Sequence, residues 1–179
     1  MSCFKNKGFT LIELLVVIAI ISLLSSVVMA SVASSRMKAR DAKRVEDLRQ
    51  IRNALELYLD DHGYYPPSGA SPCDWDCNGY RYSYNASWNA LAADLAPYLA
   101  TLPKDPINSA CAPWGANCYS YTYGNVGRTT HKAQYDLTAH LEDPGNPARC
   151  AVKGWRFMWN NGTAWCGIYS GQIYEASTY

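Results

Sequence analysis

The chain has 179 residues, a length typical of about one domain. Its 16 Lys and Arg residues against 15 Asp and Glu give a net charge of +1, which argues against a nucleic-acid-binding protein, because such proteins carry a strongly basic face. Hydrophobic residues make up 49% of the chain, which excludes a disordered protein.

Composition divides the chain into two parts near residue 63. Neither glycine nor proline occurs between Phe9 and Asp61, which favours an unbroken helix. All nine prolines and all six tryptophans follow residue 63, in a segment long enough to bury a modest core of its own. We therefore expect a short segment over residues 1–8, a helical segment over residues 9–63 and a globular head over residues 64–179.

Residues 11–33 form an apolar stretch that carries a single charge, Glu13. About 20 apolar residues cross a bilayer as a helix, so the stretch is long enough to span a membrane. The alternative is a secretory signal peptide cut after Ala30 or Ala33, but such signals have an apolar region of about 7–15 residues. The length of the stretch favours a helix that stays in the membrane.

Glu13 is the third residue of this apolar stretch. A carboxylate in hydrocarbon is costly unless it is paired, so Glu13 is a candidate functional residue. The alternative places Glu13 at the membrane interface, near enough to the end of the span to reach water.

The residues around Glu13 read Lys-Asn-Lys-Gly-Phe-Thr-Leu-Ile-Glu over positions 5–13. This segment resembles the signature of prepilins, the precursors of type IV pilins and of type II secretion pseudopilins. In that family a membrane prepilin peptidase cuts a short basic leader after its last glycine, the next residue is N-methylated, and the fifth residue of the mature chain is glutamate. The resemblance, which is close over roughly the first 65 residues, implies cleavage between Gly8 and Phe9, methylation of Phe9, and a role for Glu13 in assembly.

The resemblance also implies partners and a location. The precursor is then a single-pass protein of the inner, or cytoplasmic, membrane, surrounded by the lipid bilayer, and the mature chain joins copies of itself in a helical homopolymer at the cell surface or in the periplasm. The further partners are the prepilin peptidase and the inner-membrane assembly platform of a pilus or secretion system. Glu13 of one subunit would pair with the new amine of Phe9 on a neighbour, because each charge alone is costly in hydrocarbon.

The charges that flank the apolar stretch favour the opposite orientation. Two lysines precede the stretch, and five basic residues follow it within positions 36–44. The positive-inside rule alone would place that second group in the cytoplasm. We give precedence to the leader motif, since this family is cut on the cytoplasmic side.

Helical periodicity continues beyond the apolar stretch to residue 61. Apolar residues recur every three or four positions and form one stripe, made of Val45, Leu48, Ile51, Leu55, Tyr58 and Leu59. A single helix over residues 10–61 would be about 78 Å long at 1.5 Å per residue. We expect the charged run over residues 36–44, including an Asp41–Arg44 pair, to be solvated, with pairing between subunits as the alternative.

The head contains patterns for one short helix and several strands. Apolar spacing predicts a helix over residues 90–102, which Pro97 kinks or ends. Alternation and turn residues predict strands over residues 119–123, 133–141, 155–159 and 163–169. The expected fold class is α+β, with a long N-terminal helix packed on a small antiparallel sheet of three or four strands, which is also the type IV pilin-like fold that the resemblance implies.

Six cysteines remain in the mature chain after Cys3 leaves with the leader, and an even number in an exported head predicts disulfides. These are Cys73, Cys77, Cys111, Cys118, Cys150 and Cys166. Six cysteines allow 15 pairings, of which closeness in sequence favours Cys73–Cys77, Cys111–Cys118 and Cys150–Cys166. The last of them resembles the C-terminal disulfide loop of many type IV pilins. The alternative is a zinc site, but the spacings differ from those of zinc motifs and no histidine lies close in sequence.

Residues 74–79 match the first half of a calcium loop. Asp74, Asp76 and Asn78 fall at the ligand positions, and a glycine follows. The twelfth position holds Asn85 in place of the usual glutamate, so the alternative is a polar turn closed by a disulfide. The major pseudopilins that the chain resembles bind calcium through a C-terminal loop rich in Asp and Ser, which we do not find in residues 141–179. We expect no cofactor other than this calcium ion.

Two asparagines, Asn85 and Asn161, fit the glycosylation acceptor pattern. The pattern is short and arises by chance, so it indicates only that both side chains are exposed.

These patterns together predict a structural subunit of a type IV pilus-like filament. One alternative is a pseudopilin of a type II secretion system, and another is a monomeric, membrane-anchored module that binds surfaces. The calcium-loop mismatch and the three expected disulfides favour the surface pilus. We expect no enzyme, because the three histidines have no acid or nucleophile partner in sequence and no phosphate-binding or metalloprotease motif occurs.

Overall fold

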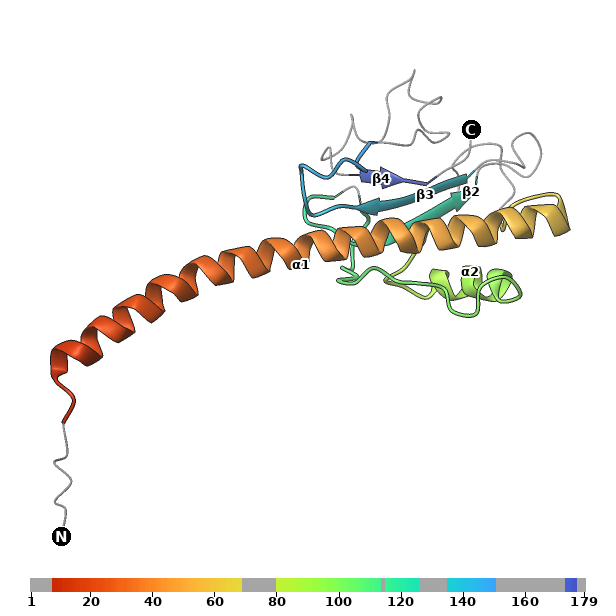
Figure 1. The fold of residues 1–179 in the computed structure, drawn as a ribbon. Helices are drawn as coiled ribbons and strands as arrows, with labels where there is room; N and C mark the ends of the chain where they lie inside the picture. Colours follow the sequence, from red (N-terminus) through yellow and green to blue (C-terminus); the bar gives the residue numbers. More distant parts are fainter. Residues whose placement is uncertain (1–7, 69–79, 114, 126–134, 151–172, 177–179) are drawn as a thin grey trace, which may run out of the picture. The chain divides into compact units, whose positions relative to one another are not determined.

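The computed structural model describes residues 8–68, 80–113, 115–125, 135–150 and 173–176. Figure 1 shows the elements in chain order, namely α1 (Leu11–His62), β1 (Arg81–Tyr82), α2 (Ser87–Leu95), β2 (Tyr121–Asn125), β3 (Tyr135–His140) and β4 (Ile173–Glu175). Contacts divide the chain into two compact units, Met1–Met37 and Lys38–Tyr179, which are described separately below. The predicted α+β class, with a long N-terminal helix and a small antiparallel sheet, is confirmed.

Helix α1 has the predicted 52 residues, displaced by one position from the expected range. It ends at His62 because Gly63 follows with a φ of 73°, a left-handed conformation that glycine adopts without steric cost. The Gly63 N–H donates to the carbonyl oxygen of Leu59 at 2.7 Å and so satisfies one of the last helical carbonyls.

One core holds the second unit together. The predicted stripe of α1 forms its floor, since Leu48, Ile51, Leu55 and Tyr58 are buried. Helix α2 and the sheet contribute the rest, chiefly Trp88, Leu91, Leu95, Tyr121, Tyr123, Tyr135 and Leu137. The core is rich in tyrosine, and its hydroxyls reach polar partners, as where Tyr121 donates to Asp47 at 2.8 Å.

The described sheet has four antiparallel strands in the order β1-β2-β3-β4. In the register of β2 and β3, Tyr123 lies opposite Leu137 on the core face. Thr122 lies opposite Thr138 on the other face, which is polar and also buried. Both faces of the central strands are therefore covered, and the alternation of apolar and polar side chains does not mark a solvent-exposed face here.

Several predicted elements differ from the observed ones. The helix predicted over residues 90–102 is wrong at both ends, because α2 spans Ser87–Leu95. Its early start follows from Asn85, whose Oδ1 accepts hydrogen bonds from the N–H and the hydroxyl of Ser87. Its end precedes Pro97, which has no N–H to continue the helix.

The strand predictions hold for the two central strands with shifted bounds. Strand β2 begins two residues later than predicted, and β3 covers residues 135–140 of the predicted 133–141. Strands β1 and β4 were not predicted. The predicted hairpin over residues 155–159 and 163–169 lies outside the described residues.

A buried ionic cluster joins α1 to two distant loops. The guanidinium of Arg44 is 0% exposed and donates to Asp105 at 2.7 Å, to Asp41 at 2.8 Å and to Glu142 at 2.6 Å. Arg40 pairs with the same Glu142 through its Nε at 2.7 Å. Burial alone would raise the pKa of Glu142, but the hydrogen bonds from both arginines outweigh it and hold the pKa below its ordinary value.

The predicted Asp41–Arg44 pair forms, but the expectation that it is solvated is wrong. Asp41 also accepts hydrogen bonds from the backbone N–H groups of Glu142 and Asp143, at 2.9 and 2.8 Å. Because Arg44, Asp41 and Glu142 each have more than one partner, the cluster fixes the loop after β3 on α1.

Replacement of Arg44 by alanine leaves Asp41, Asp105 and Glu142 without their shared cation in a buried site. We expect the free energy of unfolding to fall by about 3–5 kcal/mol, the usual cost of removing one partner of a buried ion pair. Denaturant unfolding of the detergent-solubilised chain, followed by tryptophan fluorescence, measures this. Arg49→Ala, at an exposed position of the same helix, is the control, and an equal effect of the two substitutions would contradict the structural role of the cluster.

Candidate functional site

The start of α1 brings Thr10 and Glu13 together. The Glu13 Oε2 atom accepts hydrogen bonds from the backbone N–H of Thr10 at 2.8 Å and from its hydroxyl at 2.7 Å. In return the Glu13 N–H donates to the Thr10 Oγ1 atom at 3.3 Å. This reciprocal arrangement is a capping box, in which the first and fourth residues satisfy each other's backbone N–H groups.

The sequence carries a signal for this cap that is independent of the leader motif. Thr-Leu-Ile-Glu at residues 10–13 has the threonine and glutamate spacing of a capping box directly before an apolar run. Thr10 is therefore a further residue of the site, and Glu13 has a structural role within its own chain. A carboxylate at this end of a helix is also favoured by the helix dipole.

The predicted cleavage point lies directly before the cap. Gly8 and Phe9 precede the helix, and Phe9 is 87% exposed. A Cβ atom at Gly8 would meet nothing within 4 Å, so the described structure leaves the Gly8–Phe9 peptide bond unshielded. A cut here would create an amine on Phe9. The next residue, Thr10, carries the backbone N–H that donates to the Glu13 carboxylate.

No described part of the chain covers the large apolar side chains of the first unit. Every large apolar side chain from Phe9 to Val32 is at least 41% exposed. The helix is long and apolar enough to cross a membrane. Three serines in or beside this stretch donate their hydroxyl protons to carbonyls of the helix itself, as Ser22 does to Ile18 at 2.7 Å, so these donors are satisfied without water.

This arrangement combines a small residue, Gly8, with an acid at the start of an apolar helix. Such a segment can serve as a peptidase substrate and as an ion-pair partner. The Glu13 carboxylate can form an ion pair with a cation. Its hydrogen bonds from Thr10 orient the carboxylate toward the N-terminal end of the helix.

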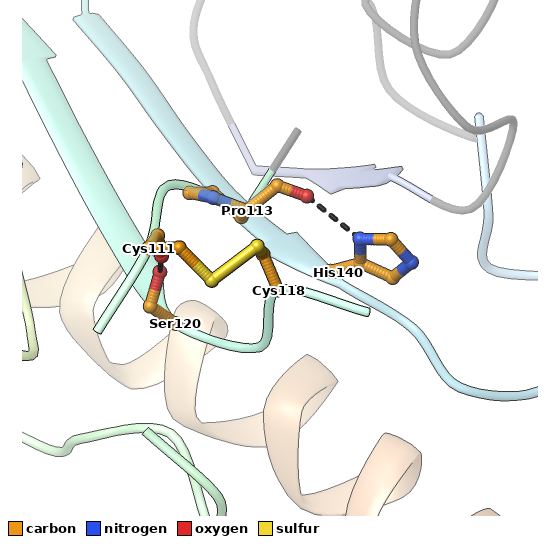
Figure 2. Close-up of a disulfide and its surroundings, with 5 residues drawn as sticks. All are labelled: Cys111, Pro113, Cys118, Ser120 and His140. Atoms are coloured by element: carbon orange, nitrogen blue, oxygen red, sulfur yellow. Dashed lines mark hydrogen bonds between the residues drawn. A yellow bond between two sulfur atoms is a disulfide. The ribbon is translucent and has the colours of Figure 1, made fainter. Parts of the chain in front are cut away.

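The head carries the predicted disulfide between Cys111 and Cys118, with the Cα atoms 5.5 Å apart (Figure 2). Two side chains fix the loop that it closes. The Ser120 hydroxyl donates to the Cys111 carbonyl at 2.6 Å, and the buried His140 donates from Nδ1 to the Pro113 carbonyl at 2.7 Å. Gly115 is required inside this loop because a Cβ atom there would lie 2.8 Å from the Cys118 Sγ atom.

The remaining predicted site residues fall partly within the described structure. Cys150 is disulfide-bonded, and Asn85 is an exposed residue whose Oδ1 accepts a hydrogen bond from the Ser87 N–H at the start of α2. Within the described ranges, no group of three or more His, Cys, Asp or Glu residues is placed to hold a metal ion. Outside the described residues lie Cys73, Asp74, Asp76, Cys77, Asn78, Asn161 and Cys166, so the calcium loop, two of the pairings and the second glycosylation acceptor stay predictions.

Comparison with known families agrees with the geometry at the start of α1. Residues 3–29 match the family model described as a prokaryotic N-terminal methylation motif. The match covers Gly8, Phe9, Thr10 and Glu13 together with most of the apolar stretch. No solved structure shows significant similarity to the chain.

Similarity to curated proteins extends well beyond this motif. The type II secretion system core protein G of Vibrio cholerae is 31% identical over 161 residues, which are 86% of this chain and 94% of that protein. The protein of the same name from Aeromonas hydrophila is 39% identical over 69% of this chain and 78% of its own length. A "Probable minor fimbrial protein" of Dichelobacter nodosus is 32% identical over 48% of this chain and 54% of that protein. The chain therefore belongs to the type IV pilin-like prepilin family, with the pseudopilins called type II secretion system core protein G.

Proposed function

We propose that the chain is a pseudopilin, the repeating structural subunit of the filament of a type II secretion system. The observation that carries this proposal is the similarity to core protein G along 94% of the Vibrio cholerae protein, head included. The cysteine pattern and the calcium-loop mismatch alone favour a surface pilus over this alternative. The similarity of the head supports the secretion system, because a leader and an apolar helix alone are common to both kinds of filament.

Processing comes first in the proposed sequence of events. The prepilin peptidase cuts the Gly8–Phe9 bond on the cytoplasmic side, and the amine of Phe9 is then methylated. The exposed, side-chain-free Gly8 supports this step, since nothing in the described structure obstructs the backbone there.

Before assembly, the apolar part of α1 lies in the bilayer as a single span. In this state the cap to Thr10 matters, because it gives the Glu13 carboxylate two hydrogen bonds from its own chain. These bonds offset part of the cost of keeping the acid near hydrocarbon.

Assembly then transfers the apolar stretch from lipid to the core of a helical filament made of copies of this chain. Glu13 of one subunit pairs there with the Phe9 amine of a neighbour. A subunit in the wrong register leaves both charges unpaired, so the pair selects one arrangement of the helices. The inner-membrane assembly platform is the further partner, and the filament lies in the periplasm.

The proposed role is that of a structural subunit. A surface pilus is the second candidate, and the similarity to the fimbrial protein of Dichelobacter nodosus supports it over about half the chain. The two functions differ in the location of the filament, periplasmic for the first and extracellular for the second.

The first prediction concerns the residue before the cut. Gly8→Leu places a branched side chain beside the scissile bond, and we expect cleavage to fall by about tenfold or more, in line with a loss of 1.4 kcal/mol or more in recognition. Mass spectrometry of the membrane protein measures the ratio of precursor to mature chain. Gly8→Ala is the matched control with a small side chain. Mature chains at the wild-type level from Gly8→Leu would rule out this cleavage site.

The second prediction separates the two roles of Glu13. Glu13→Gln keeps an oxygen that accepts from Thr10 but removes the charge, and Glu13→Val removes both. We expect both variants to insert in the membrane and to lower the yield of filaments about tenfold or more, because the Phe9 amine is then unpaired.

The yield is measured by electron microscopy and by quantifying the chain in sheared filaments, with membrane insertion as the control. If Glu13→Gln forms filaments as well as the wild type and only Glu13→Val fails, the cap and not the charge pair is what assembly requires.

A further inference from the structure

The basic residues that follow the apolar stretch of α1 fall into two groups in the structure. The first group is paired with carboxylates of the same subunit and consists of Arg40, Lys43 and Arg44, with the partners Asp41, Asp47, Asp105 and Glu142. The second group is Arg36 and Lys38, which are exposed and make no hydrogen bond or ion pair with any residue that the structure describes. The uncompensated positive charge of this run therefore lies in its first part, next to the apolar stretch.

The position of Arg36 and Lys38 along the helix matches the depth of lipid phosphates. As a helix, the apolar stretch over residues 11–33 is about 34 Å long, slightly more than the hydrocarbon core of a bilayer, which is about 30 Å thick. Arg36 lies about 4.5 Å beyond Ala33 along the axis, and Lys38 lies about 7.5 Å beyond it. The headgroup layer adds roughly 5–7 Å on each side of the hydrocarbon, so both cations fall within or beside that layer.

The two cations act independently of each other. Two residues along an α-helix turn by about 200°, so Arg36 and Lys38 lie on different sides of α1 and each reaches headgroups on its own side. Their long apolar stems let the charged ends extend to the phosphate layer. The nearest acidic residue in sequence, Asp41, is buried and bound to Arg44, so it does not compete for either cation.

We propose that Arg36 and Lys38 bind the headgroup phosphates of anionic phospholipids while the subunit lies in the membrane. The partner is a lipid because the apolar stretch ends three residues before Arg36 and so sets both cations at headgroup depth. The inference rests on the proposed function, in which the subunit lies in the bilayer before assembly, and adds a lipid-binding surface to it. Binding fixes the depth of the helix in the bilayer, and both contacts break when the subunit enters the filament.

Neutralisation of the two cations tests the proposal. The first variant is Arg36→Gln with Lys38→Gln. The second, Arg36→Lys with Lys38→Arg, exchanges the side chains and keeps both charges. Arg49→Gln with Lys104→Gln is the matched control, because it removes the same charge from exposed positions that lie farther along the chain. Thermal unfolding of each variant shows whether the head is folded.

The full chain is reconstituted in phosphatidylcholine vesicles that contain either spin-labelled phosphatidylglycerol or spin-labelled phosphatidylcholine. Electron paramagnetic resonance then gives the fraction of each labelled lipid that the chain immobilises. We expect the wild type to prefer phosphatidylglycerol about fivefold at low salt, with a smaller preference as the salt concentration rises. The exchanged variant and the control keep this preference, and the neutralised variant associates about equally with both lipids.

Equal association of both lipids with the wild type would overturn the inference, and so would an undiminished preference in the neutralised variant. A third contradicting result is a neutralised variant that keeps the lipid preference but forms fewer filaments, because the cations would then serve contacts between proteins. The proposed function is judged separately: it fails if the wild-type chain forms no filament in cells, whichever lipids it binds.

Discussion

The apolar first half of α1 is the constraint on which the rest of the structure depends. Its large apolar side chains from Phe9 to Val32 are exposed in the described structure. A contiguous apolar surface of this size is unfavourable in water and marks a contact with a membrane or with another protein. Lipid would cover such a surface in a membrane, and other apolar helices would cover it in the filament proposed above. The hydroxyls of Ser22 and Ser26 donate to carbonyls of the helix itself, which satisfies these donors in either environment.

The second half of the same helix has the opposite relation to its surroundings. One face is buried in the tyrosine-rich core, and Arg44 binds carboxylates from α1 itself, from the loop after α2 and from the segment after β3. The other face presents charged side chains to solvent, among them Lys38, Arg49 and Asp60. A single continuous helix thus carries a long apolar segment, a scaffold for the head and a charged surface, and the disulfide between Cys111 and Cys118 closes a loop on the head.

The sequence predicted the features that depend on local patterns. The 52-residue helix and the Cys111–Cys118 pair each follow from neighbouring residues or regular spacing. The burial of Arg44 was missed because its partners Asp105 and Glu142 lie 61 and 98 residues away, and no local pattern brings them together. The start of α2 was missed because apolar spacing does not reveal the hydrogen bond from the Ser87 N–H to Asn85 that precedes the helix. The capping box of Thr10 and Glu13 was within reach of the sequence, since its spacing is regular.

The central claim is that this chain is cut after Gly8 and assembled from Phe9 onward. Mass spectrometry of the N-terminal peptide, taken from filaments sheared or isolated from the producing cells, tests it most directly. We predict a peptide that begins with N-methylated Phe9. An intact Met1, or a start after Ala30 or Ala33, would contradict the account, because the apolar helix would then be an ordinary anchor or a secretory signal.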